Sequence, residues 1–245
     1  MKIHFLGTNG WFDSNMGNTT CTLIDSKDYY IILDAGFGIH KINNYIKEDK
    51  PVYLFLSHFH IDHICGLHTL PMLKLKKLTI FGQKKLKKLL NIFVNHPFSS
   101  SFSEAQFEIE LKELVPGKHN LPFEFECLPI KHVDPTFGYR IKLEEKIITY
   151  CSDTAVCPND YKLAKNADLL IHECTLRPGS TNTWGHSNPE MVAKLAKKAK
   201  VKRLALTHLG AHYYNNQKIR IKAEKIAKKI FKNTLVAKDN LTIKI

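Results

Sequence analysis

This 245-residue sequence lacks any long apolar run. No stretch approaches the ~18 apolar residues that cross a bilayer, and the first residues predict a strand rather than an apolar signal segment. The sequence also lacks internal repeats and any linker rich in proline, glycine or serine. We therefore expect a single domain over residues 1–245, with no membrane partner.

The six cysteines lack the paired spacing of a structural zinc motif. They are scattered along the chain as Cys21, Cys65, Cys127, Cys151, Cys157 and Cys174. Scattered cysteines of this kind are typical of reduced, mostly buried thiols in an intracellular protein. We therefore expect a cytoplasmic location.

Acidic residues are in the minority, with 23 Asp and Glu against 36 Lys and Arg and a formal net charge of +13. The largest concentration of lysines is Lys74, Lys76, Lys77, Lys84, Lys85, Lys87 and Lys88. Such a cluster favours phosphate-bearing partners, and salt would weaken their binding. Lysine is equally the default polar residue in a chain this rich in Asn and Ile. No aromatic residues interleave with the lysines, so sequence-specific RNA recognition is not supported.

Metal-binding side chains are abundant in one short stretch, residues 58–63. The stretch contains His58, His60, Asp62 and His63. It follows an apolar run at residues 52–56, which predicts a buried strand, and sites in layered α/β folds collect beyond the carboxyl ends of strands. A lone histidine is usually an ordinary surface or hydrogen-bonded residue. Four ligand-type residues in this pattern instead favour a loop, continuing into a helix, that serves two neighbouring metal ions.

Other segments predict the elements around this loop. Alternating or apolar stretches predict strands over residues 1–8, 19–24 and 30–36. Residues 83–93 predict an amphipathic helix whose apolar stripe faces the core. The stripe consists of Leu86, Leu89, Leu90 and Phe93.

The pattern His-x-His-x-Asp-His resembles the signature of the metallo-β-lactamase superfamily. The resemblance implies an α/β fold, the four-layer αββα metallo-β-lactamase sandwich. It also implies a further His, then an Asp, then a final His, each at the end of a strand. His132, Asp153 and His208 each follow a short apolar segment of strand character and match that order.

By this resemblance, the chain holds two divalent metal ions. His58, His60 and His132 would hold one ion. Asp62, His63 and His208 would hold the other, with Asp153 bridging them. Imidazole and carboxylate ligands suit zinc, and they also suit manganese or iron. Two such ions can generate a bridging hydroxide and clamp an anionic substrate, so the expected chemistry is hydrolysis, with Asp62 among the catalytic residues.

The turn Asp34-Ala35-Gly36 is also typical of the superfamily. The resemblance implies that Asp34 supports the metal site without binding a metal itself. As a local feature, Asp34 could instead cap the segment that follows, residues 38–46. Support of the metal site is the interpretation that we favour.

Later segments indicate which branch of the superfamily is closest. Residues 169–175, the turn Gly185-His186-Ser187, a predicted helix over residues 189–200 and the strand before His208 resemble the ribonuclease Z-like phosphodiesterase branch. In that branch a Glu and a His form a dyad that donates a proton to the departing ribose oxygen, and the matching residues here are Glu173 and His186. Taken singly, Glu173 could form an ion pair at a strand end and His186 could cap a helix.

One departure from the branch concerns the substrate. Enzymes of this branch that process tRNA carry a long, flexible arm between the third His and the bridging Asp. Only twenty residues separate His132 from Asp153 here, and they predict a hairpin of residues 139–143 and 147–151. Residues 16–18, Met-Gly-Asn, also stand where the processing enzymes commonly have an Arg-Asn pair. The sequence therefore predicts phosphodiester hydrolysis without an arm that grips tRNA.

We accordingly expect a dinuclear metal-dependent phosphodiesterase of the ribonuclease Z-like kind that acts on RNA. The alternative is a hydrolase of small cyclic phosphodiesters, such as a cyclic nucleotide or a cyclic ribose phosphate. Thioester or lactam hydrolysis is less favoured, because neither reaction would need the proton-donating pair of Glu173 and His186. A non-catalytic nucleic-acid-binding domain would not need all seven ligands. Assembly as a homodimer is compatible with the sequence.

Overall fold

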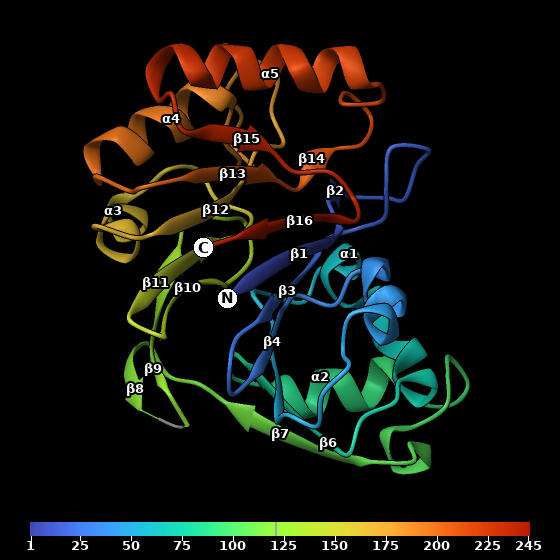
Figure 1. Cartoon of the computed structure of the whole chain (residues 1–245). Helices are drawn as coiled ribbons and strands as arrows, with labels where there is room; N and C mark the ends of the chain where they lie inside the picture. The colour runs from blue at the N-terminus through green and yellow to red at the C-terminus, as the bar shows by residue number, and fades with distance from the viewer. Residues whose placement is uncertain (121) are drawn as a thin grey trace.

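Two large β-sheets pack face to face in the computed structural model, which describes residues 1–120 and 122–245 (Figure 1). In spatial order the first sheet contains β16 (Leu241–Lys244), β1 (Lys2–Gly7), β3 (Cys21–Asp25), β4 (Tyr30–Leu33), β5 (Val52–Phe55), β6 (Lys77–Gly82) and β7 (Glu108–Glu113). The second contains β15 (Thr234–Val236), β13 (Leu204–Thr207), β12 (Leu169–Glu173), β11 (Lys146–Cys151), β10 (Thr136–Leu143), β9 (Glu124–Ile130) and β8 (Gly117–Asn120). The short strands β2 (Asn9–Gly10) and β14 (Leu209–Gly210) pair with each other.

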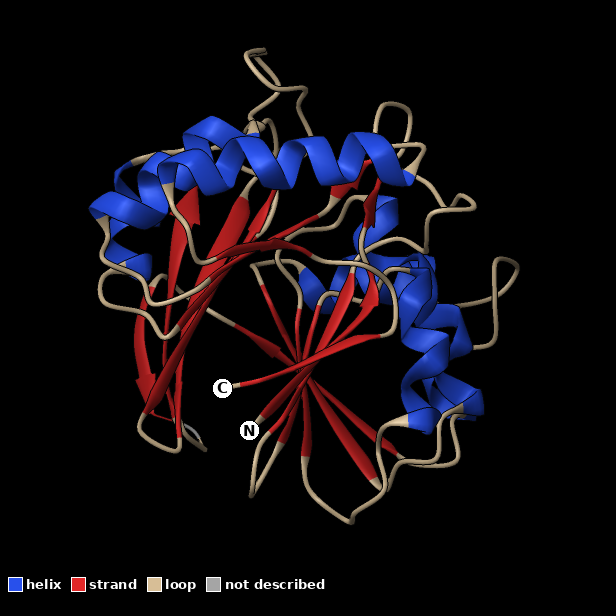
Figure 2. Cartoon of the chain, turned by 45° about the horizontal axis from the view of Figure 1, so that its top comes forward, coloured by secondary structure: helices blue, strands red, loops and turns tan. Residues whose placement is uncertain are grey.

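Helices cover the outer faces of both sheets, so the strands lie between helical layers (Figure 2). On the first sheet these are η1 (Phe37–Asn44), α1 (Ile61–Ile64), η2 (Cys65–Met72) and α2 (Leu86–Phe93). On the second they are α3 (Pro158–Ala164), α4 (Pro189–Lys198) and α5 (Gln217–Ile230). A short η3 (Phe102–Glu104) precedes β7. This order of layers confirms the predicted αββα sandwich.

Alternating side chains explain why both faces of the sheets are buried. In β4, Ile31 and Leu33 point between the two sheets, whereas Tyr30 and Ile32 point toward the helices. A strand with apolar residues on both faces has no solvent-facing side and is buried within the layers. Each large side chain of this kind contributes roughly 1.5–3 kcal/mol through removal from water. The layers are therefore apolar, and polar chemistry is confined to their edges.

The strand directions bring several loops to one edge of the sandwich. β5 is parallel to β4 and β6, and β12 is parallel to β11 and β13. β9 and β11 both run antiparallel to β10, so they share one direction. The carboxyl ends of neighbouring parallel strands meet at the same edge, where sites collect in such folds. The predicted ligands follow these ends.

Two features of α2 differ from the sequence prediction. The helix begins at Leu86 rather than at residue 83, because Lys85 adopts a left-handed conformation with φ of 73°. Gln83 instead donates from Nε2 to the Ser57 and Pro135 carbonyls at 2.7 and 2.6 Å. Leu86 and Leu90 are buried as expected, but Leu89 is 36% exposed. Gln83, which directly follows β6, thus connects this strand to the loop after β5.

The chain between His132 and Asp153 folds as the predicted hairpin of β10 and β11. Leu143 pairs with Lys146, and the two residues between them both have positive φ, 50° at Glu144 and 58° at Glu145. Those values are typical of the tightest class of hairpin turn. This segment therefore leaves no place for an inserted arm.

Two further expectations can be compared with the structure. All six cysteines are free, and four of them are buried. Among the described residues, no helix has both the length and the apolar character needed to cross a membrane.

Candidate metal centre

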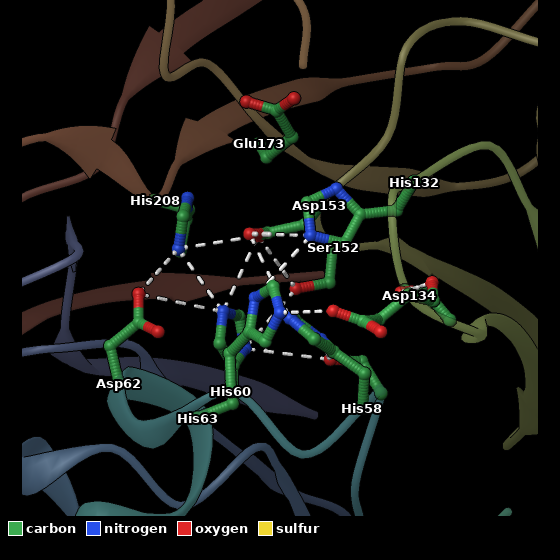
Figure 3. A network of polar contacts seen from close by, with 12 residues as sticks. His58, His60, Asp62, His63, His132, Asp134, Ser152, Asp153, Glu173 and His208 are labelled. Carbon is green, nitrogen blue, oxygen red and sulfur yellow. Dashed lines mark hydrogen bonds and ion pairs between the residues drawn. The ribbon is translucent and has the colours of Figure 1, made fainter. Parts of the chain in front are cut away.

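All seven predicted ligands converge at the edge where the strand ends meet (Figure 3). His58 and His60 follow β5, Asp62 and His63 lie in α1, and His132, Asp153 and His208 follow β9, β11 and β13. Their donor atoms form two groups, within each of which all atoms lie within 4.8 Å of one another. One group contains His58, His60, His132 and Asp153, and the other contains Asp62, His63 and His208. The two groups contain the two sets of three residues that the resemblance implies, with Asp153 in the first group; their binding of metal stays a prediction.

The Asp153 carboxylate lies between the two groups. Its Oδ1 is 3.4 Å from His63 Nε2 and 3.2 Å from His208 Nε2. Its Oδ2 is 3.9 Å from His58 Nε2 and 3.8 Å from His132 Nε2. Because one oxygen faces each group, this side chain has the placement that a bridging ligand needs.

The donor atoms of the first group fit a metal ion. His60 Nδ1 lies 3.4 Å from His132 Nε2. His58 Nε2 is buried and has no hydrogen-bond partner among residues 1–120 and 122–245. A buried polar atom left unpaired is costly. A divalent cation accepting its lone pair would satisfy His58, so the residues present fit a metal site.

The second group is held together by short contacts around one carboxylate. Asp62 Oδ2 lies 3.1 Å from His208 Nε2 and 3.7 Å from His63 Nε2. The same oxygen accepts a hydrogen bond of 2.6 Å from the Trp11 backbone N–H. Asp62 is therefore fixed in direction from outside its own helix.

Electrostatics of the site favour bound cations. Burial lowers the pKa of His58 well below its usual value, and the neighbouring His63 lowers it further. A neutral imidazole is the form that binds a metal. Burial also raises the pKa of Asp153, but His208 and His63 outweigh this and hold that pKa well below its usual value. The site thus presents a neutral His58 imidazole beside an ionised Asp153 carboxylate. At His63, by contrast, the carboxylates of Asp62, Asp153 and Asp34 outweigh burial and raise the pKa well above its usual value.

Each of the five histidines has a partner for its second ring nitrogen. The pairs are His58 Nδ1 with Ser57 Oγ at 3.0 Å, His60 Nε2 with Asp134 Oδ2 at 2.8 Å, His63 Nδ1 with Asp34 Oδ2 at 2.8 Å, His132 Nδ1 with the Gly185 carbonyl at 3.2 Å, and His208 Nδ1 with Thr175 Oγ1 at 2.9 Å. Partners of this kind fix ring orientation and tautomer at metal sites. The sequence analysis missed Ser57, Asp134 and Thr175. Only Asp134, a carboxylate two residues after His132, offered a local signal.

Asp34 contacts the candidate ligand His63, which agrees with the interpretation that it supports the metal site. Besides His63, its buried carboxylate accepts hydrogen bonds from Ser57 N at 2.7 Å, Ser57 Oγ at 2.8 Å and Tyr150 OH at 2.6 Å. The N-cap of η1 is Gly36, so the capping alternative is wrong. Asp34 itself has a positive φ of 58°, a conformation that Asp and Asn tolerate better than other side chains.

The substitution Asp34→Asn tests this support. Asparagine keeps the shape and tolerates the backbone conformation, but it removes the negative charge beside His63. We expect metal affinity to fall by about 10- to 100-fold, the usual effect of losing such a partner. Titration of metal-free protein against a chromophoric chelator measures the affinity. Tyr150→Phe removes one donor to Asp34 and keeps its charge, so it should weaken metal binding less; equal affinity in Asp34→Asn and wild type would contradict the assignment.

The predicted dyad lies beside both groups. Glu173 is buried at the end of β12, where it accepts from the backbone N–H of Thr175 and of Ser187, both at 2.6 Å. His186 Nδ1 lies 3.4 Å from Glu173 Oε1, an ion-pair contact. The His186 ring centroid is 5.1 Å from that of His132 and 6.2 Å from that of His208.

The neighbouring Glu173 carboxylate raises the pKa of His186. Burial lowers its pKa, but the Glu173 carboxylate outweighs burial and raises the pKa to about 9. The Glu173 carboxylate thus favours the protonated form of the imidazole. The helix-capping alternative is wrong, because Asn188 is the N-cap of α4 and its side chain accepts from Met191 N at 2.9 Å.

Comparison with known proteins decides the family. A family model described as the beta-lactamase superfamily domain matches residues 29–209. The chain belongs to the beta-lactamase superfamily. Two solved structures agree with its fold. The metallo-beta-lactamase fold protein YhfI from Bacillus subtilis has a TM-score of 0.81 at 24% identity over 99% of both chains. The short form of human tRNase Z has a TM-score of 0.80 at 23% identity and covers 100% of this chain and 99% of its own.

A curated relative indicates the branch of the superfamily. Ribonuclease Z of Ligilactobacillus salivarius (strain UCC118) is 30% identical, with 100% of this chain and 97% of the relative covered. This likeness confirms the predicted ribonuclease Z-like branch, so this superfamily member is a metal-dependent hydrolase. The alignment spans 310 positions against 245 residues here, so at least 65 positions have no counterpart in this chain. That difference agrees with the closely turned hairpin after His132.

Proposed function

We propose that this superfamily member is a dinuclear metal-dependent phosphodiesterase that hydrolyses RNA. The position of Asp153 is the observation that carries the proposal, since its two carboxylate oxygens face two separate groups of ligand-type residues. RNA as the substrate is supported by relatives named ribonuclease Z and ribonuclease BN. The net charge of +13 would attract such a polyanion.

The proposed ligand sets follow the two groups. His58, His60 and His132 would hold one ion. Asp62, His63 and His208 would hold the other, with Asp153 shared. We propose zinc, because an imidazole-rich set with carboxylates suits it well.

The proposed chemistry is hydrolysis of a phosphodiester with assisted departure of the ribose oxygen. Two bound divalent ions would activate a water as the nucleophile and offset the negative charge of the phosphate. A P–O bond breaks, and its electron pair leaves with the ribose oxygen. His186 would give that oxygen a proton from Nε2, because its Nδ1 faces Glu173. Two backbone N–H groups hold the Glu173 carboxylate, which keeps the imidazole in place.

A small cyclic phosphodiester is the second candidate substrate. The chain between His132 and Asp153, where the resemblance would put a tRNA-gripping arm, contains the tightly turned hairpin of β10 and β11. A small substrate would need no such arm. Thioester and lactam hydrolysis remain weaker candidates because they leave Glu173 and His186 without a role.

A direct substrate comparison tests the proposal. The metal-loaded protein is incubated with bis-p-nitrophenyl phosphate, a 3′-extended tRNA precursor, unstructured RNA and 2′,3′-cyclic nucleotides. We expect all phosphodiesters to be cleaved, with kcat/KM for RNA at least about tenfold above that for cyclic nucleotides, or about 1.4 kcal/mol in transition-state binding. Higher kcat/KM for cyclic nucleotides would favour the second candidate. Hydrolysis of none of them would exclude both.

We also propose that residues 1–245 act as a single domain, because the candidate ligands come from loops of both sheets. The cytoplasmic location and assembly as a homodimer stay predictions.

A further inference from the structure

Both tryptophans of the chain are exposed. The sequence contains two, Trp11 and Trp184, and their exposed fractions are 71% and 66%. Tryptophan is normally highly buried, because its large apolar ring gains free energy on leaving water. Exposure of both therefore requires an explanation.

Trp11 is fixed to one group of the metal centre. Its backbone N–H donates to Asp62 Oδ2 at 2.6 Å. Its φ is 78°, a left-handed conformation that is a genuine outlier for a bulky residue. Such a conformation persists only where surrounding contacts impose it. The indole also meets the His212 ring edge-on, with 5.6 Å between centroids.

Trp184 is fixed beside the other group. The next residue, Gly185, offers its carbonyl to His132 Nδ1 at 3.2 Å. Gly185 has a positive φ of 86°, and a Cβ there would lie 2.6 Å from His132 Cα, so its backbone is pressed against the ligand candidate. His186 follows directly. Trp184 is thus anchored at the His132 end of the centre, as Trp11 is at the Asp62 end.

A third segment, which contains His212 and Tyr213, contacts both of the loops that carry the tryptophans. Arg177, in the loop that leads to Trp184, places its guanidinium 4.7 Å from the centroid of the Tyr213 ring. Tyr213 directly follows His212, which supports Trp11. The two indoles therefore belong to one connected rim around the metal centre.

We propose that Trp11 and Trp184 are stacking platforms for nucleobases on either side of the scissile phosphodiester. Every base has a flat π-face, so exposed aromatic rings bind unpaired nucleotides with little regard to sequence. A strand whose phosphate lies at Asp153 would place one flanking nucleotide toward Trp11 and another toward Trp184. The platforms and the net positive charge together fit an unpaired RNA strand. This inference rests on the proposed function and names the part of the substrate that it recognises.

Paired variants separate stacking from mere bulk. Trp11→Leu and Trp184→Leu keep an apolar side chain that cannot stack, whereas Trp11→Phe and Trp184→Phe keep an aromatic face. We expect each leucine variant to raise the Kd for unstructured RNA by about 5- to 150-fold, which corresponds to the ~1–3 kcal/mol of one stacked base. The phenylalanine variants should recover much of this loss. Binding can be followed by quenching of the remaining tryptophan's fluorescence, without turnover.

An RNA with abasic riboses next to the cleavage position provides the decisive comparison. It keeps every phosphate but offers neither flanking base, so wild type should bind it more weakly than either single leucine variant binds normal RNA. The leucine variants should lose nothing further on the abasic strand. Equal losses on both strands, or no loss on either, would overturn the stacking role. Failure of the protein to cleave any phosphodiester would instead refute the proposed function.

Discussion

Replacing Asp153 with alanine is expected to abolish binding of both metal ions and nearly all phosphodiester hydrolysis. The two oxygens of this side chain face His63 and His208 on one side and His58 and His132 on the other. Its removal would leave both groups one ligand short. It would also remove the carboxylate that balances the charge of two cations in a buried site.

The effect should exceed that of losing a supporting residue. Loss of an outer partner typically costs about 10- to 100-fold in metal affinity or activity, and loss of a shared ligand should cost more. We expect fewer than one ion per chain by elemental analysis and below about one hundredth of wild-type turnover of bis-p-nitrophenyl phosphate.

Asp168→Ala is the matched control for this change. Asp168 precedes β12 at the end of the strand away from Glu173, where its carboxylate accepts from Lys202 and from the Ile147 backbone. This variant should keep two ions and its turnover. Retention of two ions by Asp153→Ala would contradict the bridging role.

Removal of the proton donor should affect one class of substrate far more than another. A positioned acid contributes typically about 10²- to 10⁴-fold when the leaving group is a poor one. Ribose leaves as an alkoxide, whereas p-nitrophenolate leaves readily without protonation. His186→Ala should therefore reduce kcat for RNA by that factor, reduce turnover of bis-p-nitrophenyl phosphate much less, and leave metal content intact. Equal losses on both substrates would refute the donor assignment.

The pH dependence provides an independent check on the dyad. The Glu173 carboxylate raises the pKa of His186 to about 9 against the opposing effect of burial. The donor form exists below this pKa, so kcat for RNA should fall as the pH rises through it. Bound cations lower the pKa from that value. Glu173→Gln removes the charge that raises it, so the falling limb should move to lower pH than in wild type. An unmoved limb would show that another group controls it.

The candidate metal ligands could be predicted from the sequence, whereas most of the residues that support them could not. Residues 58–63 contain four ligand-type residues, three His and one Asp, after an apolar run, and His132, Asp153 and His208 each follow a segment of strand character. The resemblance to the superfamily brought these residues together, and their position at strand ends agrees with it, because neighbouring parallel strands end at the same edge of a sheet. The start of α2 was placed three residues too early, since nothing local showed that Gln83 would bond to the loop after β5.

The sequence determined the layered fold, the set of ligand candidates and the absence of room for an arm, because its short motifs resemble those of a known superfamily and imply the features of that family. Apart from Asp34, only the tertiary structure decided which residues support the site and which lie near it. Asp134 and Thr175 matter through single side-chain directions toward His60 and His208. Trp11 and Trp184 lie far apart in the sequence, and their loops come to one centre because Asp62 in α1 accepts from Trp11 N–H and His132 after β9 contacts the Gly185 carbonyl.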